Sequence, residues 1–326
     1  MLWIPASAGM TTEKEQIMSV PMQTETITAR GEQTRQAPLT VKDFKGKADP
    51  DWCPGCGDFG VLTALKQALV DLNLHPHQVM TISGIGCSSN MPGYVSTYGM
   101  HTLHGRALAV ATGAQLANHD LKIIVTGGDG DGYGIGGNHF VHSMRRNVDL
   151  TYIVMNNQIY GLTTGQISPT STKGMKTKST PIGSVENPIF PVSLAIAAGA
   201  TYVARGYTGQ VKHLVDLIKG GIQHKGFALI DAFSPCVTFN LDNTHEFFKH
   251  RTKKLEDMGH DPTDFAAAIQ KSYEWGDEIP IGLFWKREDL PSLDQLEPIL
   301  DEGGPLARRP LGVSPDIAKS LVRELM

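Results

Sequence analysis

The chain has 326 residues, 40% of them hydrophobic, and a formal net charge of −4 at neutral pH. This composition is typical of a globular protein with a substantial core. The mild acidity argues against a nucleic-acid partner, because proteins that bind phosphate backbones usually concentrate Lys and Arg. No run of about 18 apolar residues occurs, so we expect no membrane span.

The N-terminal stretch, residues 1–45, is polar over most of its length and lacks a basic segment followed by a long apolar run. It therefore predicts a flexible lead-in rather than a secretory signal. We expect the ligand-binding domain over residues 46–240. Residues 241–326 begin with charged and aromatic side chains, and we expect a C-terminal extension that packs on the core or on another subunit.

Predicted strands and helices alternate from residue 59 onward. Leucines at three- and four-residue spacing predict a helix over Phe59–Leu72, and an apolar run that ends in a glycine turn predicts a strand from Val79. Helices are expected over 106–119 and 138–147, strands over 122–128 and 150–156, and the alternation continues to residue 233. This order predicts an α/β fold, a mostly parallel sheet with helices on both faces.

Side chains with possible chemistry follow several of the predicted strands. Cys87 follows one strand, Asp129 the next, Asn156 and Asn157 the one after, and Cys236 the last. Ligands in such sheets bind at the carboxyl ends of the strands. We therefore expect these distant segments to converge on one edge of the sheet.

The stretch "GGDGDGYGIGG", residues 127–137, lies between a predicted strand and a predicted helix. Glycines at the start of a helix leave backbone N–H groups free for an anion such as phosphate. An aspartate beside a diphosphate would repel it unless a divalent cation such as Mg²⁺ lay between them. A Rossmann-like dinucleotide loop or an ordinary turn is the alternative for an isolated Gly-Asp-Gly.

A second oxygen donor is expected from the following strand, because Asn157 lies 28 residues after Asp129 and a βαβ unit spans about 30 residues. Gly-Asp-Gly followed by Asn-Asn at this distance resembles the thiamine diphosphate motif. The resemblance implies that Asp129, Asn157 and the carbonyl of Ile159 bind Mg²⁺. Asp131 is left open between a cofactor contact, a contact with a neighbouring loop and a turn cap.

The sequence contains four cysteines, Cys53, Cys56, Cys87 and Cys236, and the first two form a C-x-x-C pair. Such a pair suits zinc, an iron–sulfur cluster or a redox couple, and a lone cysteine is usually a buried apolar residue. All four lie in turns rich in Gly or Pro, where backbone N–H groups can bond to cluster sulfurs. The neighbouring thiamine motif favours a 4Fe-4S cluster over zinc.

Five motifs then occur in order: "WCPGCGDFG", "GIGCSSNMPGY", "HTLHGRALAVATG", the segment from "GGDGDGYGIGG" to "GLTTGQISPTS", and "FSPC". Together they resemble the β subunit of 2-oxoacid:ferredoxin oxidoreductases, over about Phe44 to Trp285. The 2-oxoglutarate type, also called 2-oxoglutarate synthase, is the most similar, and pyruvate-using relatives are close.

The resemblance implies a thiamine diphosphate-binding domain of the diphosphate type, with Mg²⁺ and one 4Fe-4S cluster. It assigns the cluster to Cys53, Cys56, Cys87 and Cys236. It assigns cofactor contacts to Ile85, Gly86, Cys87, Ser88, His104, Gly130, Asp131, Gly161 and Leu162. His104 is also the expected catalytic residue, although a surface or interface histidine is the alternative.

The implied activity is the oxidative decarboxylation of 2-oxoglutarate to succinyl-CoA and CO₂, with electrons passed through the cluster to ferredoxin. The implied partners are an α subunit, ferredoxin, coenzyme A and the 2-oxoacid, in the cytoplasm. A pyruvate enzyme and a non-catalytic metal-binding or electron-transfer subunit are the alternatives. Thr164 stands where many relatives have lysine, which affects the expected substrate and acyl acceptor.

Overall fold

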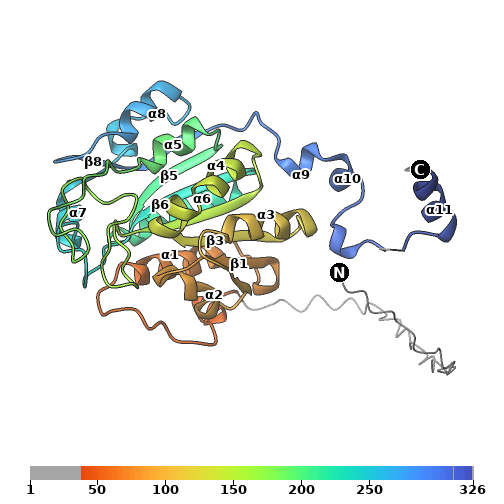
Figure 1. The fold of residues 1–326 in the computed structure, drawn as a ribbon, viewed down its shortest axis with the longest axis horizontal. Coiled ribbons are helices and arrows are strands. Elements are labelled where there is room, and N and C mark those ends of the chain that lie inside the picture. Colours follow the sequence, from red (N-terminus) through yellow and green to blue (C-terminus); the bar gives the residue numbers. More distant parts are fainter. Residues whose placement is uncertain (1–37, 311, 325–326) are drawn as a thin grey trace, which may run out of the picture. The chain divides into compact units, whose positions relative to one another are not determined.

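The structure is a computed structural model that describes residues 38–310 and 312–324. Its centre is an eight-stranded sheet in the order β2-β1-β3-β4-β6-β5-β8-β7 (Figure 1). Neighbouring strands run parallel, except that β5 and β8 pair antiparallel. The strands are β1 (Val79–Ser83), β2 (Tyr98–His101), β3 (Lys122–Gly128), β4 (Leu150–Asn156), β5 (Tyr202–Tyr207), β6 (Phe227–Phe233), β7 (Thr252–Lys254) and β8 (Ile279–Lys286).

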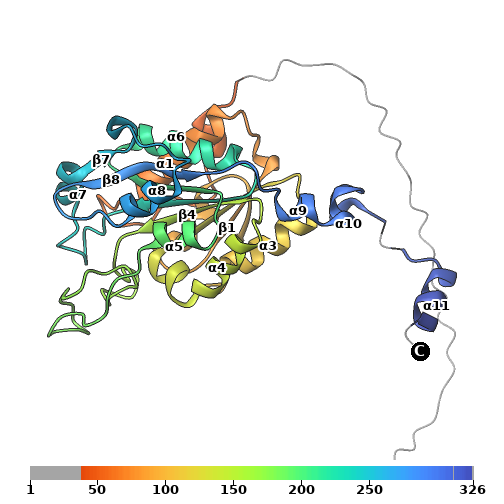
Figure 2. The same cartoon turned by 90° about the horizontal axis from the view of Figure 1, so that it is seen from above.

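Helices cover both faces of the sheet, so the expected α/β fold is confirmed (Figure 2). One face is covered by α1 and α6, and the other by α3, α4, α5 and α8. The helices are α1 (Asp58–Asp71), α2 (Met91–Tyr94), α3 (Ala107–Ala117), α4 (Gly137–Arg145), α5 (Pro191–Ala197), α6 (Val211–Gln223), α7 (His245–Arg251), α8 (Phe265–Ser272), α9 (Leu293–Leu296), α10 (Pro298–Asp301) and α11 (Pro315–Glu324).

The central strands are buried on both faces. All seven residues of β4 and all seven of β6 are buried, as expected for parallel strands that lie between two layers of helices. Phe140 and Phe227 pack on one face, and Leu65 and Ile230 pack on the other. No helix among the described residues is both long and apolar enough to cross a membrane.

Residues 41–44, which fall within the lead-in expected over residues 1–45, are packed on the domain. Residues 1–37 lie outside the described part of the chain, but Val41–Phe44 form a 3₁₀ turn, η1, and Phe44 is fully buried. Phe44 packs in the same apolar cluster as Leu65 of α1. The burial of one large aromatic side chain therefore fixes this segment on the domain.

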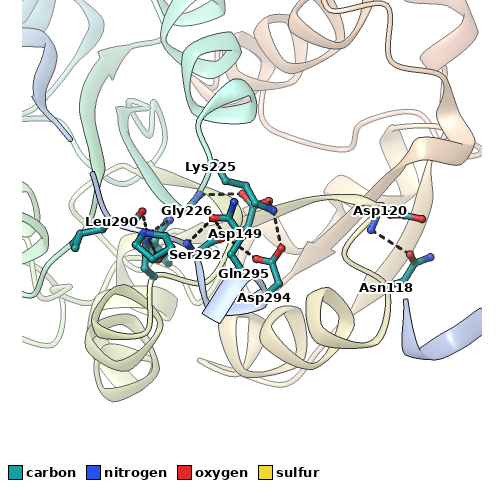
Figure 3. A network of polar contacts seen from close by, with 12 residues as sticks. Asn118, Asp120, Asp149, Lys225, Gly226, Leu290, Ser292, Asp294 and Gln295 are labelled. Atoms are coloured by element: carbon teal, nitrogen blue, oxygen red, sulfur yellow. Dashed lines mark hydrogen bonds and ion pairs between the residues drawn. The ribbon is translucent and has the colours of Figure 1, made fainter. Parts of the chain in front are cut away.

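The segment after residue 240 contributes β7 and β8 to the central sheet, and its later part is tied to the core by polar contacts. Lys225 forms ion pairs of 2.8 Å with Asp149 and with Asp294 of α9 (Figure 3). The side chain of Asn147 donates a hydrogen bond of 3.1 Å to the carbonyl of Pro291. These contacts hold α9 and the loop before it close to the amino ends of β4 and β6.

A buried ion pair joins the parallel strands to the antiparallel β8. Arg205 Nε of β5 lies 3.7 Å from Asp231 Oδ2 of β6, and both side chains are at most 4% exposed. Arg205 also donates to the carbonyls of Ser272 in α8 and Pro280 in β8, at 3.2 and 3.4 Å. Burial raises the pKa of Asp231, and the facing guanidinium opposes this shift.

We predict that Arg205→Met lowers the free energy of unfolding by about 3–5 kcal/mol, because it leaves the Asp231 carboxylate buried without a cation. The exposed Arg287, which pairs with Asp289 at 2.7 Å, is the matched control. Arg287→Met should cost at most about 1 kcal/mol. Urea unfolding measures both variants, and equal losses in the free energy of unfolding would contradict the prediction.

A second prediction concerns acid stability. His224 Nε2 lies 2.7 Å from Thr201 Oγ1, and burial, together with Lys286, lowers the pKa of His224. The unfolded chain then takes up a proton near pH 6.5 while the folded chain resists it, so stability falls as the pH drops below about 6.5. His224→Gln should reduce this loss in melting curves between pH 7.5 and 5. An unchanged pH slope would contradict the assignment.

Candidate functional site

Four adjacent parallel strands end at the same edge of the sheet, and the candidate residues follow them there. Cys87 begins the 3₁₀ turn η3 (Cys87–Asn90) after β1, Asp129 directly follows β3, Asn157 follows β4 and Cys236 lies after β6. The strand order β1-β3-β4-β6 makes these four strand ends neighbours. The convergence expected from the sequence is therefore present.

A cavity of about 100 Å³ lies at this edge, and every residue assigned by resemblance to thiamine diphosphate or Mg²⁺ lines it. These residues are Ile85, Gly86, Cys87, Ser88, His104, Asp129, Gly130, Asp131, Asn157, Ile159, Gly161 and Leu162. Five further lining residues were not predicted from the sequence, and they are Asp58, Gly128, Met155, Tyr160 and Thr163. We refer to this space as the thiamine cavity.

The glycine-rich stretch forms a wide helical turn rather than an open loop. Residues Gly130–Ile135 form the π-helical turn η4, which is kinked by non-helical backbone at Gly134, and α4 begins after Gly136. A side chain at Gly130 would lie 2.2 Å from the ring of Tyr160, and one at Gly132 would lie 1.9 Å from the hydroxyl of Tyr152. Glycine therefore lets the two tyrosines pack directly against the turn. Such π turns often occur at functional sites.

Asp129 is held at the base of the thiamine cavity and is 1% exposed. Its Oδ2 atom accepts hydrogen bonds of 2.5 Å from the hydroxyls of Ser168 and Thr170. Burial raises the pKa of Asp129 to about 6, although both hydroxyls favour the charged form. A cation beside Asp129 would offset this cost of burying a carboxylate. In the sequence these partners stand in the cluster "SPTS", residues 168–171, whose pattern alone indicates no role.

The segment after β4 is fixed by local hydrogen bonds. Asn157 Oδ1 accepts from the Ile159 N–H at 3.1 Å, and the carbonyl of Asn157 accepts from the Asn240 side chain at 2.9 Å. The hydroxyl of Tyr160 donates to the carbonyl of Gly130 at 2.9 Å. Tyr160 therefore ties this segment to the glycine-rich turn on the other side of the cavity.

Asp131 is 3% exposed, and its carboxylate is directed to protein groups. Its Oδ1 atom lies 3.0 Å from the Ile85 N–H, 2.8 Å from the Gly105 N–H and 2.8 Å from Nδ1 of His104. Of the alternatives left open by the sequence, the structure thus shows a contact with neighbouring loops. Asp131 also lines the cavity, so the cofactor contact stays a prediction.

A second cavity, of about 240 Å³, is lined by all four cysteines, Cys53, Cys56, Cys87 and Cys236. It shares Gly86, Cys87, Asn157, Gly161 and Leu162 with the thiamine cavity. A Cβ atom on Gly161 would lie 3.4 Å from the sulfur of Cys236 and 3.8 Å from that of Cys87. The two cavities therefore lie side by side, and the backbone of Gly161 lies near both sulfurs. We refer to this second space as the cysteine cavity.

Two of the thiols in the cysteine cavity, those of Cys56 and Cys87, are poorly placed to ionise by themselves. Burial, with a smaller contribution from Asp58, raises the pKa of Cys87 to about 12 and also raises that of Cys56. No group of three or more His, Cys, Asp or Glu residues in the described chain is close enough to hold a single metal ion. A 4Fe-4S cluster needs more widely spaced ligands than a single metal ion, because each cysteine binds a separate iron around a larger core.

Two further residues, Asp58 and Thr164, line the thiamine cavity and the cysteine cavity, respectively. Asp58, at the start of α1, is 1% exposed, and its Oδ1 atom accepts a hydrogen bond from Ser234. Burial raises the pKa of Asp58 to about 6. Thr164 lines the cysteine cavity in a left-handed backbone conformation with φ 74°, which is unfavourable for a β-branched residue. Thr164, which stands where many relatives have lysine, thus lies at the cysteine cavity.

Comparison with known families identifies two regions. Residues 78–232 match the thiamine pyrophosphate enzyme C-terminal TPP-binding domain, and residues 236–302 match the C-terminal part of the pyruvate ferredoxin oxidoreductase β subunit. The first region contains β1 to β6 and nearly all residues of the thiamine cavity, so the thiamine-binding domain is established at the family level.

Individual relatives are similar over most of the chain. The β subunit of 2-oxoacid:ferredoxin oxidoreductase 1 from Aeropyrum pernix is 49% identical over 75% of this chain and 80% of the relative, and that of Saccharolobus solfataricus is 51% identical over 75% and 84%. A solved 2-oxoglutarate:ferredoxin oxidoreductase from Magnetococcus marinus, with 2-oxoglutarate, coenzyme A and succinyl-CoA bound, has a TM-score of 0.80 and 44% identity over 87% of this chain and 96% of that one. The chain therefore belongs to the β subunits of the 2-oxoacid:ferredoxin oxidoreductases.

Proposed function

We propose that this chain is the β subunit of an enzyme that oxidises 2-oxoglutarate to succinyl-CoA and CO₂ and passes the electrons to ferredoxin. The observation that carries the proposal is the adjacency of the thiamine cavity and the cysteine cavity across Gly161. The substrate is supported by the KorB subunit of Mycobacterium tuberculosis 2-oxoglutarate oxidoreductase, 47% identical over 64% of this chain, and by the Magnetococcus marinus structure.

The thiamine cavity suits a diphosphate together with a divalent cation. Three buried aspartates, Asp58, Asp129 and Asp131, line it, and neither Lys nor Arg appears among its described lining residues. A diphosphate would be repelled here unless Mg²⁺ compensated the negative charge. We assign Mg²⁺ to Asp129, Asn157 and the Ile159 carbonyl. Bound thiamine diphosphate supplies the electron sink for loss of CO₂.

The chain's own groups then have distinct roles. The glycine-rich turn at Gly130 brings backbone N–H groups to the diphosphate, as at other helix starts. The turn at Ile85, Gly86 and Ser88 and the residues Gly161 and Leu162 line the remaining walls of the cavity. His104, with a side chain 42% exposed at the rim, is the proposed catalytic residue that exchanges protons with the substrate.

The cysteine cavity suits a 4Fe-4S cluster bound by Cys53, Cys56, Cys87 and Cys236. Burial raises the pKa of Cys56 and of Cys87, so iron must displace the protons of these two thiols when the cluster binds. The bound cluster supplies a one-electron acceptor next to the thiamine site. Because cysteines in reducing compartments stay free to bind metal, we propose a cytoplasmic location.

An α subunit is the expected partner of a β subunit, and the size of the thiamine cavity supports a shared site. At about 100 Å³ the cavity is smaller than the 300–1,000 Å³ that is typical of sites for small ligands. This chain therefore encloses only part of thiamine diphosphate. We propose that the α subunit encloses the rest and that coenzyme A and the 2-oxoacid enter between the two chains.

The decisive test is anaerobic co-purification with the α subunit, followed by analysis of iron, sulfide and thiamine and by ferredoxin reduction assays. We expect four irons per β chain, bound thiamine diphosphate and turnover with 2-oxoglutarate and coenzyme A. Faster turnover with pyruvate would change the substrate assignment alone. Zinc in place of iron, or the absence of thiamine, would instead support a non-catalytic subunit.

We further predict that Asp129→Ala abolishes Mg²⁺-dependent binding of thiamine diphosphate, with a loss of affinity of at least about 100-fold, because the cation loses a charged ligand. Titration calorimetry on the thiamine-stripped complex measures this. Asp216→Ala, an exposed change on α6, is the control and should bind normally. Retained affinity in Asp129→Ala, with Mg²⁺ still required, would rule out Asp129 as the ligand.

A further inference from the structure

Asp131 connects three segments that are far apart in the sequence. Its Oδ1 atom accepts hydrogen bonds from the N–H groups of Ile85, after β1, and of Gly105, before α3, while Asp131 itself lies in η4. The same atom lies 2.8 Å from Nδ1 of His104. All these residues except Gly105 line the thiamine cavity. One carboxylate oxygen of η4 therefore connects the turn after β1 and the turn before α3, and all three segments contribute residues to the cavity wall.

The surrounding backbone is shaped to admit this carboxylate. A Cβ atom on Gly84 would lie 1.8 Å from Asp131 Oδ2, so a glycine is required there. Gly105 has φ 68°, and a Cβ atom on it would lie 2.6 Å from the Gly136 nitrogen. Oδ2 is buried without a hydrogen-bond partner in the described chain. The hydrogen bonds of Asp131 within the described chain are therefore made through Oδ1.

The contact with His104 fixes the protonation pattern of the imidazole ring. Oδ1 of Asp131 already accepts from two backbone N–H groups, so we assign it the acceptor role toward His104 as well and place the ring proton on Nδ1. The other nitrogen, Nε2, makes no hydrogen bond within the described residues and can exchange a proton with a ligand. A carboxylate behind a histidine orients the ring and selects the tautomer in this way.

We propose that Asp131 is a positioning residue of the thiamine site. It joins the turns at Ile85 and Gly105 and selects the His104 tautomer that presents Nε2 to the substrate. This inference rests on the proposed function and adds a role for the second aspartate of the Gly-Asp-Gly-Asp stretch that differs from metal binding. Asp131 therefore has two separate effects. One is on the shape of the thiamine cavity, and the other is on the tautomer of His104.

Two substitutions separate these effects in the αβ complex. Asp131→Asn keeps an oxygen that accepts from the two backbone N–H groups, so the Kd for thiamine diphosphate with Mg²⁺ should change less than about threefold. It removes the charge that holds His104, so kcat should fall at least about 10-fold. Asp131→Ala removes both contacts and should also raise the Kd at least about 10-fold. The exposed Asp216→Asn is the control.

A double-mutant cycle tests whether Asp131 acts through His104. In a His104→Ala background, Asp131→Asn should lower kcat less than about twofold, because the group that it orients is gone. A merely structural role predicts the same loss of kcat in both backgrounds, and that result would overturn the proposal. So would an unchanged Kd in Asp131→Ala.

Binding of thiamine diphosphate to the unmodified complex shows which of the two proposals has failed. If that complex fails to bind thiamine diphosphate, the proposed function is wrong. If it binds thiamine diphosphate and the Asp131 variants match it in Kd and kcat, only the positioning role is wrong.

Discussion

The arrangement of the site depends on the buried charge of Asp231. This residue lies in β6, and its Oδ1 atom accepts hydrogen bonds of 3.0 Å from Tyr133 of η4 and from Asn156 at the end of β4. Its other oxygen faces Arg205, which reaches β8 and α8. A buried carboxylate is costly unless it is paired and hydrogen-bonded, so the elements around it cannot move independently. The ends of β4 and β6, and the glycine-rich turn beside them, are thereby fixed.

From this centre, polar contacts continue to the thiamine cavity. Asn156 lies 3.0 Å from the hydroxyl of Thr170, and that hydroxyl also contacts Asp129. On the far side of η4, Asp131 fixes the turns that follow β1 and precede α3. Both aspartates of the motif are thus held by protein groups before any ligand binds. Such preorganisation reduces the free energy needed to order a site on binding.

Much of the fold could be predicted from sequence because the central strands are continuous apolar runs. The ranges expected for β3 and β4 agree with the structure, as does the run at residues 227–233. The sequence did not reveal β2, which is exposed at all four positions, or β8, which contains Pro280 and Gly282. Their pairing is set by the neighbouring strands. Likewise, topology predicted that Asp129 and Asn157 lie near Cys87 and Cys236, whereas the partners of Asp131 depend on side-chain geometry that no periodicity encodes.

The small volume of the thiamine cavity has a thermodynamic consequence for assembly. A ligand that is enclosed by two chains binds the pair more tightly than either chain alone. By linkage, the same free energy must strengthen the association of the chains when the ligand is present. Cofactor supply would then control how much of the subunit is assembled. Under the proposed shared site, bound thiamine diphosphate would therefore stabilise the complex of the two chains.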